Sequence, residues 1–290
     1  LFGRLFMKPI NIVINKLNRL ATGDFTARIH FDSVFSKHPT VAELTDSFNT
    51  MASELEKTEM LRSDFVNDFS HEFKTPIVSI AGFARLLKNE TLDREQRREY
   101  LNIIEEESLR LSDMATNVLN LAKVENQQIL SNVSAFNLSE QVRNCFLQLE
   151  DKWSGKNLDA DFDFGEVQIC GNEELLRQVW LNLLDNAVKF TPYGGEVRIK
   201  IEEREDSVCV SVINTGSTVA PENRERIFRK FFQEDRSHST KGNGIGLAVV
   251  RQIVNLHGGS VWVESEQDCT TFKVLLPKTA DERTGTLKNS

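Results

Sequence analysis

The sequence predicts a multidomain protein, with an all-α N-terminal part that includes a dimeric four-helix bundle and an α/β two-layer sandwich after it. Through the first ~130 residues, apolar side chains recur three and four apart, as on one face of a helix. Short β-branched segments then alternate with helical ones, which is typical of a layered α/β domain. The chain has 290 residues, 40% of them apolar, enough for two or three cores. We expect domains at residues 1–60, 61–130 and 131–278, and a polar tail at 279–290.

Composition excludes some classes of protein. The net charge of −8 at pH 7 argues against a nucleic-acid-binding protein, because such proteins carry basic patches that neutralise phosphates. The four cysteines are scattered, without a C-x-x-C pair or metal-ligand spacing, so we interpret them as reduced thiols of a cytosolic protein. Runs of about 18 apolar residues are absent from the sequence, so no segment in it spans a membrane by itself.

The opening residues 1–10 nevertheless read like the cytoplasmic end of a transmembrane helix. Arg4 and Lys8 would then follow the excess of positive charge on the cytoplasmic side. An ordinary amphipathic start is the alternative. Because the sequence starts at Leu1 and not at a methionine, we expect a fragment of a longer protein. That protein would be anchored in the cell membrane through a segment before Leu1, with the present part in the cytoplasm.

Residues 4–60 are expected to form two short amphipathic helices. Pro9 can occupy the first turn of the first helix, which ends at Gly23 and Asp24. An extended connector follows at residues 25–31. The second helix carries apolar residues at near-heptad spacing, namely Val41, Leu44, Phe48, Met51 and Leu55. Two such helices cannot bury their apolar stripes alone, which implies oligomerisation. The unit resembles a HAMP linker in these residues: Pro9, Gly23-Asp24, Glu43 and Phe48-Asn49-x-Met51.

Residues 61–128 are expected to form a helical hairpin. Its first helix runs to Lys88, the turn occupies residues 89–93, and Thr91 or Asp93 caps the second helix. The second helix shows a heptad seam with one polar break, formed by Tyr100, Ile104, Glu107, Leu111, Met114, Val118 and Leu121. Two hairpins would pair into a four-helix bundle, so we expect a homodimer.

His71 lies on the first helix of this hairpin. An apolar stripe on that helix falls within about 60° on a helical wheel, and it consists of Phe65, Phe69, Ile80, Phe83 and Leu87. His71 lies about 150° from the stripe and should face water, and Thr75 lies one turn further on the same face. An exposed imidazole beside Glu72 offers a donor, an acceptor and a nucleophilic nitrogen. Pro76 removes a backbone donor and should bend the helix.

The segment Phe69-Ser70-His71-Glu72-Phe73-Lys74-Thr75-Pro76 resembles the signature of the dimerisation and phosphoacceptor domain of sensor histidine kinases. The resemblance implies that His71 accepts a phosphoryl group, that Glu72 acts as its base, and that Thr75 helps to position a water for dephosphorylation. A helix histidine without a chemical role is the alternative for an isolated residue. A zinc site of the H-E-x-x-H type is excluded because residue 75 is threonine. The remaining histidines have no partner at metal or triad spacing and are interpreted as surface or packing residues.

Residues 133–277 are expected to alternate strands and helices. The predicted strands are 158–162, 167–169, 197–203, 208–213, 260–265 and 271–276. The predicted helices run from residue 138 to Lys152, from Glu173 to Phe190, and onward from the glycines at 242–246. From Lys278 the tail is polar, and we expect it to be disordered.

Three groups of residues in this region suggest chemistry. Asn182, Asn186 and Lys189 are four and three apart, so they share a helix face. An amide oxygen can bind Mg²⁺, and a lysine supplies a point charge for phosphate, although a solvated helix face is the alternative. The second group is Gly242-Asn243-Gly244-Ile245-Gly246, where glycines and a helix N-terminus could approach a polyphosphate. It matches neither a P-loop nor a dinucleotide fingerprint. In the third group, Ile213-Asn214-Thr215-Gly216, a strand ends in a tight turn.

Together the three groups resemble the ATP-binding domain shared by histidine kinases, type II topoisomerases and related ATPases. The segment Ile227-Phe228-x-x-Phe231-Phe232 matches the phenylalanine box of the kinases. The resemblance implies that ATP and Mg²⁺ are cofactors, that Asn186 holds the Mg²⁺, and that the glycines anchor a lid over the phosphates. The implied nucleotide-binding residues are Asn182, Asn186, Lys189, Phe190, Asn214, Gly216, Gly242, Gly244, Gly246 and Leu247.

Two residues depart from the family pattern. Asn214 stands where members usually have an aspartate that accepts a hydrogen bond from the adenine amino group. Asparagine can still accept through its carbonyl oxygen, but loss of the charge should cost about 1 kcal/mol, or roughly fivefold in affinity. Thr218 replaces a usual glycine, and so adds a Cβ where the turn can need a left-handed backbone. We therefore expect ATP binding that is weakened but not abolished.

The order of linker, acceptor hairpin and ATP domain implies a sensor histidine kinase. Such an enzyme would phosphorylate His71 from ATP and pass the phosphoryl group to an aspartate of a response-regulator receiver domain, and it could also dephosphorylate that regulator. Two alternatives stay open. One is a degenerate kinase that acts mainly as a phosphatase or scaffold. The other is a stand-alone ATPase of the same nucleotide fold.

Overall fold

The computed structural model describes residues 2–31, 38–89, 92–127, 129–233, 244–266 and 268–279, with side chains from residue 10 onward. Contacts divide the chain into two compact units, Leu1–His71 and Glu72–Ser290. The boundary lies within one long helix, so the two units share a continuous helical backbone. Among the helices of the described residues, none is both long enough and apolar enough to cross a lipid bilayer.

The first unit contains helix α1 (Phe2–Ala21), an extended connector and the first part of helix α2 (Pro39–Leu86). Helix α1 begins ahead of Pro9, so the prediction that Pro9 lies in the first turn is wrong. The chain leaves α1 at Gly23, whose φ of +91° favours glycine. The core of the unit consists of Leu20, Ile29, Phe48 and Ala52, with Val13, Phe25 and Phe31 packed against it. Other apolar side chains of the two helices stay exposed in the single chain, among them Ile10, Ile14, Leu17, Leu44, Met51 and Leu55.

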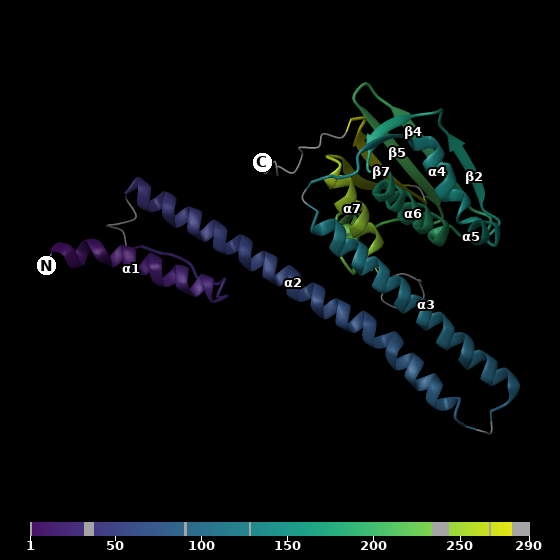
Figure 1. The fold of residues 1–290 in the computed structure, drawn as a ribbon, viewed down its shortest axis with the longest axis horizontal. Helices are drawn as coiled ribbons and strands as arrows, with labels where there is room; N and C mark the ends of the chain where they lie inside the picture. The colour runs from purple at the N-terminus through teal and green to yellow at the C-terminus, as the bar shows by residue number, and fades with distance from the viewer. Residues whose placement is uncertain are drawn as a thin grey trace. The chain divides into compact units, whose positions relative to one another are not determined.

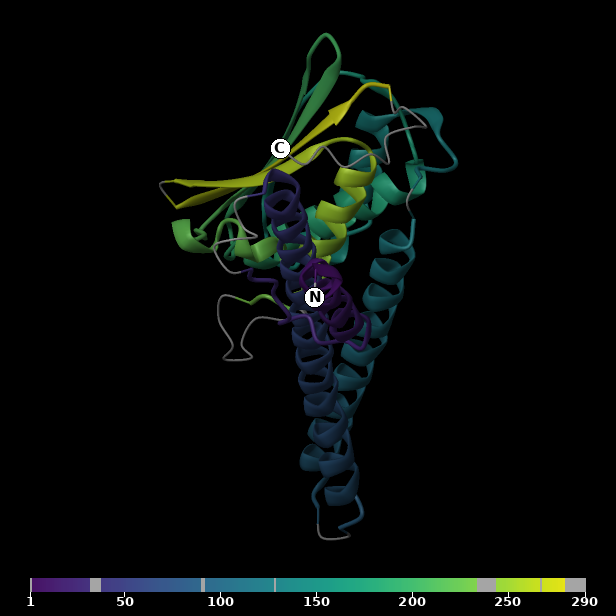
Figure 2. The same ribbon diagram turned by 90° about the vertical axis from the view of Figure 1, so that its left-hand side faces the viewer.

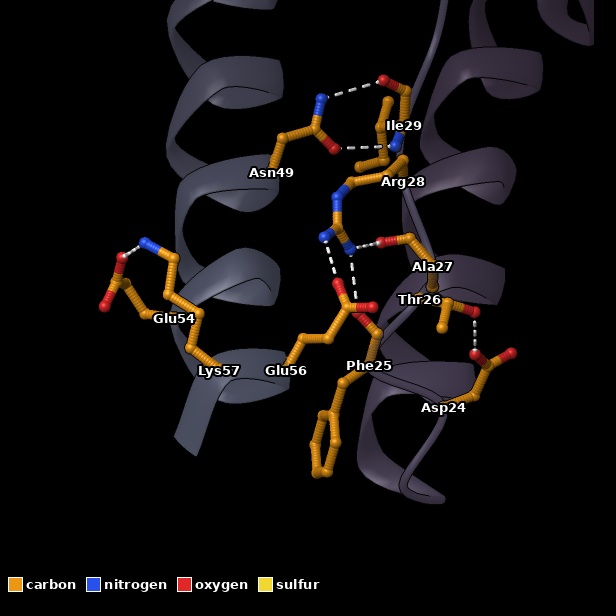
Figure 3. Close-up of polar contacts among 10 residues, drawn as sticks. All are labelled: Asp24, Phe25, Thr26, Ala27, Arg28, Ile29, Asn49, Glu54, Glu56 and Lys57. Atoms are coloured by element: carbon orange, nitrogen blue, oxygen red, sulfur yellow. Dashed lines mark hydrogen bonds and ion pairs between the residues drawn. The ribbon is translucent and has the colours of Figure 1, made fainter. Parts of the chain in front are cut away.

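Polar contacts fix the connector to α2 (Figure 3). The amide group of Asn49 makes two hydrogen bonds to the backbone of Ile29: Oδ1 accepts from the N–H at 2.8 Å, and Nδ2 donates to the carbonyl at 3.0 Å. The guanidinium of Arg28 forms a 2.5 Å ion pair with Glu56 and also donates to the carbonyls of Phe25 and Ala27. Within the Phe48-Asn49 motif, one side chain therefore fills the core and the other holds the connector in register.

Helix α2 joins two helices that the sequence predicted separately. It runs without interruption for 48 residues, through the expected domain boundary at residue 60 and through Pro76. A bend at Pro76 stays a prediction. The turn after α2 leads into α3 (Arg94–Glu125), which starts with a reciprocal cap: Asp93 accepts from the backbone N–H of Gln96 at 2.7 Å, and the Gln96 side chain accepts from the N–H of Asp93. Asp93 is therefore the cap; the other candidate, Thr91, lies outside the described residues.

Two sheets organise the C-terminal domain (Figure 1). Strand β1 (Ser134–Asn137) pairs antiparallel with β3 (Gln168–Gly171). The main sheet has the order β2 (Asp159–Asp163), β4 (Glu196–Glu203), β5 (Ser207–Thr215), β7 (Cys269–Pro277) and β6 (Ser260–Glu266). Its strands pair antiparallel, except that β2 and β4 are parallel. The order places the end of β5, with Asn214, in the middle of the sheet.

Helices α4 (Leu138–Leu147), α6 (Glu173–Phe190) and α7 (Gly246–Leu256) cover one face of the main sheet (Figure 2). Alternate side chains of the strands are buried beneath them, including Val197, Ile199, Val210, Val212 and Val274. The predicted two-layer α/β sandwich is confirmed. Helix α7 also packs against α3, where Met114, Leu121 and Val124 are buried, and Lys230 forms a 2.6 Å ion pair with Glu125 at the end of α3.

Two elements of this domain differ from the predictions. The expected single helix from residue 138 to Lys152 is two helices, α4 and the short α5 (Glu150–Ser154), because the chain turns at Gln148 and Leu149. Strand β1 was not predicted; it is four residues long, and it exists through its pairing with β3. A 3₁₀ turn at Pro221–Asn223 precedes the phenylalanine box, and a second one at Arg226–Phe228 contains the first two residues of the box.

Candidate functional site

Helix α6 presents the predicted asparagine and lysine face. Its start is fixed by Asn172, whose side chain accepts from the N–H of Leu175 at 2.9 Å. Its apolar face is buried against the sheet, through Leu176, Val179, Trp180, Leu183, Leu184, Ala187 and Val188. Asn182, Asn186 and Lys189 lie on the other side and are half-buried. The face is therefore not simply a solvated one.

Lys189 lies in the last turn of α6. Its ammonium is 4.6 Å from the centre of the Phe190 ring. Burial lowers the pKa of Lys189 below its ordinary value, and the Asp185 carboxylate opposes this shift. Two nearby cations, Arg110 and Lys156, add to the lowering of the pKa. Arg110 and Lys156 thus lie close enough to Lys189 to act on its charge, and the ammonium of Lys189 is the cation of this group that we expect to meet a phosphate.

The start of α7 lies against the middle of α6. A Cβ added to Gly246 would be 2.5 Å from Oδ1 of Asn182, so only glycine leaves this asparagine in place. The Asn182 amide also donates to the carbonyl of Gln178 at 2.8 Å, which orients its oxygen. Leu247, in the first turn of α7, is half-buried. The structure thus brings Asn182 and Gly246 together from segments far apart in the sequence.

The glycine segment also contacts the phenylalanine box. The backbone N–H of Phe231 donates to the carbonyl of Gly244 at 2.8 Å, and both residues have positive φ, 58° and 64°. A Cβ on Gly244 would be 2.7 Å from the backbone of Phe231. The phenylalanine box therefore fixes one end of the glycine segment. Gly242, also predicted as a site residue, lies outside the described residues.

Asn214 and Gly216 lie at the end of β5. Asn214 is 1% exposed, and its Nδ2 donates to Oγ of Ser217 at 2.9 Å. Gly216 has a φ of +79°, and a Cβ there would be 2.3 Å from the ring of Pro192. Because Pro192 lies two residues after the end of α6, the end of β5 and the turn after α6 are packed against each other with no space for a side chain at residue 216.

The expected strain at Thr218 is absent. The non-glycine residues of positive φ in the described chain are Asn132, Asn157, Phe231 and Asp268, so the backbone of Thr218 is in an ordinary region.

The phosphoacceptor candidates lie in α2. His71 and Thr75 are exposed, one turn apart, and Glu72 is half-buried. Glu72 accepts from the guanidinium of Arg110 on α3 at 3.5 Å, and the same guanidinium lies 3.9 Å from Glu107. An arginine between two carboxylates holds the Glu72 side chain in one orientation.

Sequence reasoning missed two residues here. Arg110 belongs to no motif, and Glu107, its neighbour, was noted only as a polar break in a heptad seam. Lys156 was not singled out, yet its ammonium makes three hydrogen bonds at the end of α6. The polar break at Glu107 was the one available signal, because a buried carboxylate in a seam requires a cation.

Among the described residues no cluster of three or more His, Cys, Asp and Glu side chains could hold a metal ion. A Mg²⁺ site in this chain would thus depend on an amide oxygen, such as that of the half-buried Asn186, together with ligand phosphates and water. This donor set suits a metal that arrives with a nucleotide rather than a resident metal.

Three family models match the chain. Residues 171–280 match the histidine kinase-, DNA gyrase B- and HSP90-like ATPase, residues 61–127 match the His kinase A phosphoacceptor domain, and residues 1–57 match the HAMP domain. The predicted combination of these domains is confirmed.

Curated relatives share this organisation. The chain is 30% identical over 271 residues to sensor histidine kinase CusS of Escherichia coli O6:H1, covering 93% of this chain and 56% of the relative. It is 28% identical over 272 residues to heme sensor protein HssS of Staphylococcus aureus strain Newman, covering 93% of this chain and 58% of that protein. The chain thus spans a little over half the length of the curated relatives it matches.

Solved structures also resemble the chain. The crystal structure of histidine kinase ThkA in complex with response regulator protein TrrA matches with a TM-score of 0.67 and 29% identity, over 79% of this chain and 65% of that one. Full-length ShkA in complex with AMPPNP matches with a TM-score of 0.54 and 29% identity, over 77% of this chain and 47% of that one.

Proposed function

The chain is a homologue of the sensor histidine kinases and contains their HAMP, phosphoacceptor and ATPase domains, and from this premise we propose that it phosphorylates its own His71 from ATP. The phosphoryl group would then pass to an aspartate of a separate response-regulator protein. The support for a regulator partner is the homologous kinase ThkA, whose structure was solved in complex with a response regulator protein.

In the proposed reaction, a ring nitrogen of His71 attacks the γ-phosphorus of ATP. The new P–N bond forms as the bond from the γ-phosphorus to the bridging oxygen breaks, and ADP leaves. Glu72 takes or orients the ring proton, and Arg110 holds Glu72 in position for this task. Correct placement of the two reactants supplies most of the rate, because the protein forms few bonds itself.

The nucleotide would lie over the exposed face of α6. Asn182 and Lys189 would contact phosphates, Asn186 would hold Mg²⁺, and Asn214 would accept from the adenine amino group. Bound Mg²⁺ would neutralise charge on the phosphates. Gly244 and Gly246 let the chain approach the phosphates, and Leu247 and Phe190 flank them.

The chain would act as a homodimer attached to a membrane. Apolar side chains that remain exposed on both long helices support dimerisation, including Met60, Leu61, Val66, Leu101, Leu109 and Leu119. We propose a membrane anchor before Leu1, which the match of residues 1–57 to the HAMP domain supports. This part of the chain would then lie in the cytoplasm.

The observation that carries the proposal is the close approach of Gly246 to Asn182, because it supports a phosphate-binding role for these two residues in a chain whose α2 exposes His71. The test is incubation with [γ-³²P]ATP. We expect a label on the protein that is stable to base and labile to acid, is lost in His71→Gln, and is kept in the control His30→Gln, another exposed histidine. Label that survives His71→Gln would disprove the assignment.

A second function has one observation in its favour. Residue 214 is an asparagine, whose Nδ2 donates to Oγ of Ser217, and it lacks the charge that would strengthen an adenine contact through Oδ1. A kinase with weak nucleotide binding could act mainly as a phosphatase, with Thr75 positioning water. Dephosphorylation of a phosphorylated regulator, with no labelling of His71 even at millimolar ATP, would favour this function.

A further inference from the structure

Lys156 makes an unusual set of contacts at the end of α6. Its ammonium donates to three backbone carbonyls, those of Val188 at 2.9 Å, Lys189 at 2.7 Å and Thr191 at 2.8 Å. An ammonium has three hydrogen-bond donors, so all of them are used. The carbonyl of Lys156 in turn accepts from the N–H of Gly194 at 2.9 Å, which ties the same turn from its other side.

The bonded carbonyls belong to the helix end that needs partners. The last carbonyls of an α-helix have no intrahelical donor, and they carry the negative end of the helix dipole. The N–H and the hydroxyl of Thr191 satisfy the carbonyl of Ala187, and Pro192 cannot donate at all. Lys156 supplies donors to the carbonyls that follow Ala187, and so it determines how the chain leaves α6.

This turn carries several residues of the candidate nucleotide site. The backbone carbonyl of Lys189 is one of the three that accept from Lys156, and Phe190 follows Lys189 in the chain. Pro192 packs on Gly216 without room for a Cβ on that glycine. A shift of the turn would therefore move Lys189, which we expect to contact phosphate, together with Pro192, which packs against the end of β5.

Lys152 provides a comparison within the same segment. It also reaches α6, through a 2.6 Å ion pair with Asp185, but its side chain is 62% exposed and it bonds no backbone carbonyl of the turn. Replacing either Lys152 or Lys156 by alanine would remove one positive charge from the same segment of the chain. Only the loss of Lys156 would also remove the hydrogen-bond donors of the backbone carbonyls at the end of α6.

We propose that Lys156 is a positioning residue for nucleotide binding, which acts by holding the turn from α6 to β4 through these three carbonyls. The inference rests on the proposed function, since it assigns to this turn the residues that would hold the nucleotide. Lys156 does not itself need to contact the nucleotide.

The experiment compares Lys156→Ala and Lys152→Ala with the unsubstituted chain. Nucleotide affinity is measured by calorimetric titration with ADP, and folding is checked by circular dichroism. We expect affinity to fall about tenfold in Lys156→Ala, and to change less than twofold in Lys152→Ala. The truncated side chain leaves three carbonyls facing a space that an ammonium ion can enter. Ammonium chloride should therefore restore part of the affinity of Lys156→Ala, and tetramethylammonium chloride at equal ionic strength should not.

Hydrogen exchange adds a readout without nucleotide. The amides of Gly194 and Gly195 should exchange faster in Lys156→Ala, and ammonium should slow them again. Unchanged affinity in Lys156→Ala, or lost affinity with no response to ammonium in either measurement, would overturn the inference and leave the proposed function intact. Failure of the unsubstituted chain to bind ADP would instead overturn both.

Discussion

Gly246, the first residue of α7, approaches Asn182 of α6 so closely that a Cβ on the glycine would lie 2.5 Å from the asparagine Oδ1. Real Cβ atoms do not come so near to another heavy atom. The contact therefore fixes two properties of the site together: the direction of the Asn182 amide and the path of the chain into α7.

Gly246→Ala should weaken nucleotide binding while the fold persists. The added methyl group must displace the Asn182 side chain, and the hydrogen bond that its Nδ2 donates to the Gln178 carbonyl would then be lost. Loss of one oriented polar contact predicts an affinity about tenfold lower. Titration with ADP measures the change. Gly165→Ala is the matched control, because a Cβ there meets no atom within 4 Å, and equal losses in the two variants would contradict the interpretation.

Asn214→Asp should strengthen the binding of adenine nucleotides. In the present chain, Nδ2 of Asn214 donates to Oγ of Ser217; with a carboxylate, the Ser217 hydroxyl can donate instead. The charged acceptor would then be available to the adenine amino group, which predicts about fivefold tighter ATP binding. Inosine triphosphate lacks that amino group and should gain nothing. A variant that gains equally for both nucleotides, or for neither, would show that Asn214 does not contact the base.

The sequence predicted most of the elements that position the site, for local reasons. Helix α6 was predicted with its observed bounds, and the structure shows local signals at both ends: Asn172 caps its start, and Pro192 follows its last residues. Helix α2 was predicted as two helices, yet residues 56–64 contain neither glycine nor proline, and nothing there ends a helix. The break between α4 and α5 also lacks both residues, so tertiary packing produces it.

The residues of the candidate site also fall into two groups, those that lie in sequence motifs and those whose partners are distant in the sequence. Asn182, Asn186, Lys189, Gly244 and Gly246 lie in contiguous motifs, so the sequence groups them by spacing, and the resemblance to the ATP-binding domain implies their roles. Arg110 and Lys156 act across sequence separations of 38 and up to 35 residues, so their partners exist only once the chain has folded.

Acid should destabilise the ATPase domain through His257. This residue is 3% exposed; its Nε2 accepts from the N–H of Asn172, and its Nδ1 lies 2.8 Å from the carbonyl of Ile253. Burial lowers the pKa of His257 below its ordinary value, although the bond to Ile253 raises it. In the unfolded chain, with a pKa near 6.5, the imidazole takes up a proton that the folded protein does not accept. The stabilisation is therefore full above that pH and is lost as the pH falls.

Urea unfolding at about pH 7.5 and about pH 5.5 tests this, with a loss of up to ~1.4 kcal/mol expected per pH unit. His257→Gln, whose amide can still accept from Asn172, should flatten the difference between the two conditions. His30→Gln, at an exposed position, should leave it unchanged. The same pH dependence in all three proteins would assign the effect to other groups.

Arg110→Met should slow phosphorylation of His71 without weakening nucleotide binding. The guanidinium is the partner of Glu72 at 3.5 Å, and methionine preserves the apolar length of the side chain while removing that partner. Glu72 would keep its charge but lose its fixed direction. Since removal of a general base costs about 10²–10⁴ in rate, and here the base is only misplaced, we expect roughly tenfold slower labelling. Glu72→Gln should cost more.

The rate is measured at saturating [γ-³²P]ATP, so that a change in affinity cannot imitate it. Arg97→Met, at an exposed position on the same helix, controls for the loss of a positive charge from α3. A double variant separates positioning from other effects: if Arg110 acts through Glu72, then Arg110→Met should have little further effect once Glu72 is glutamine. Additive losses in the double variant would mean that Arg110 supports the reaction by another route, such as its charge near Lys189.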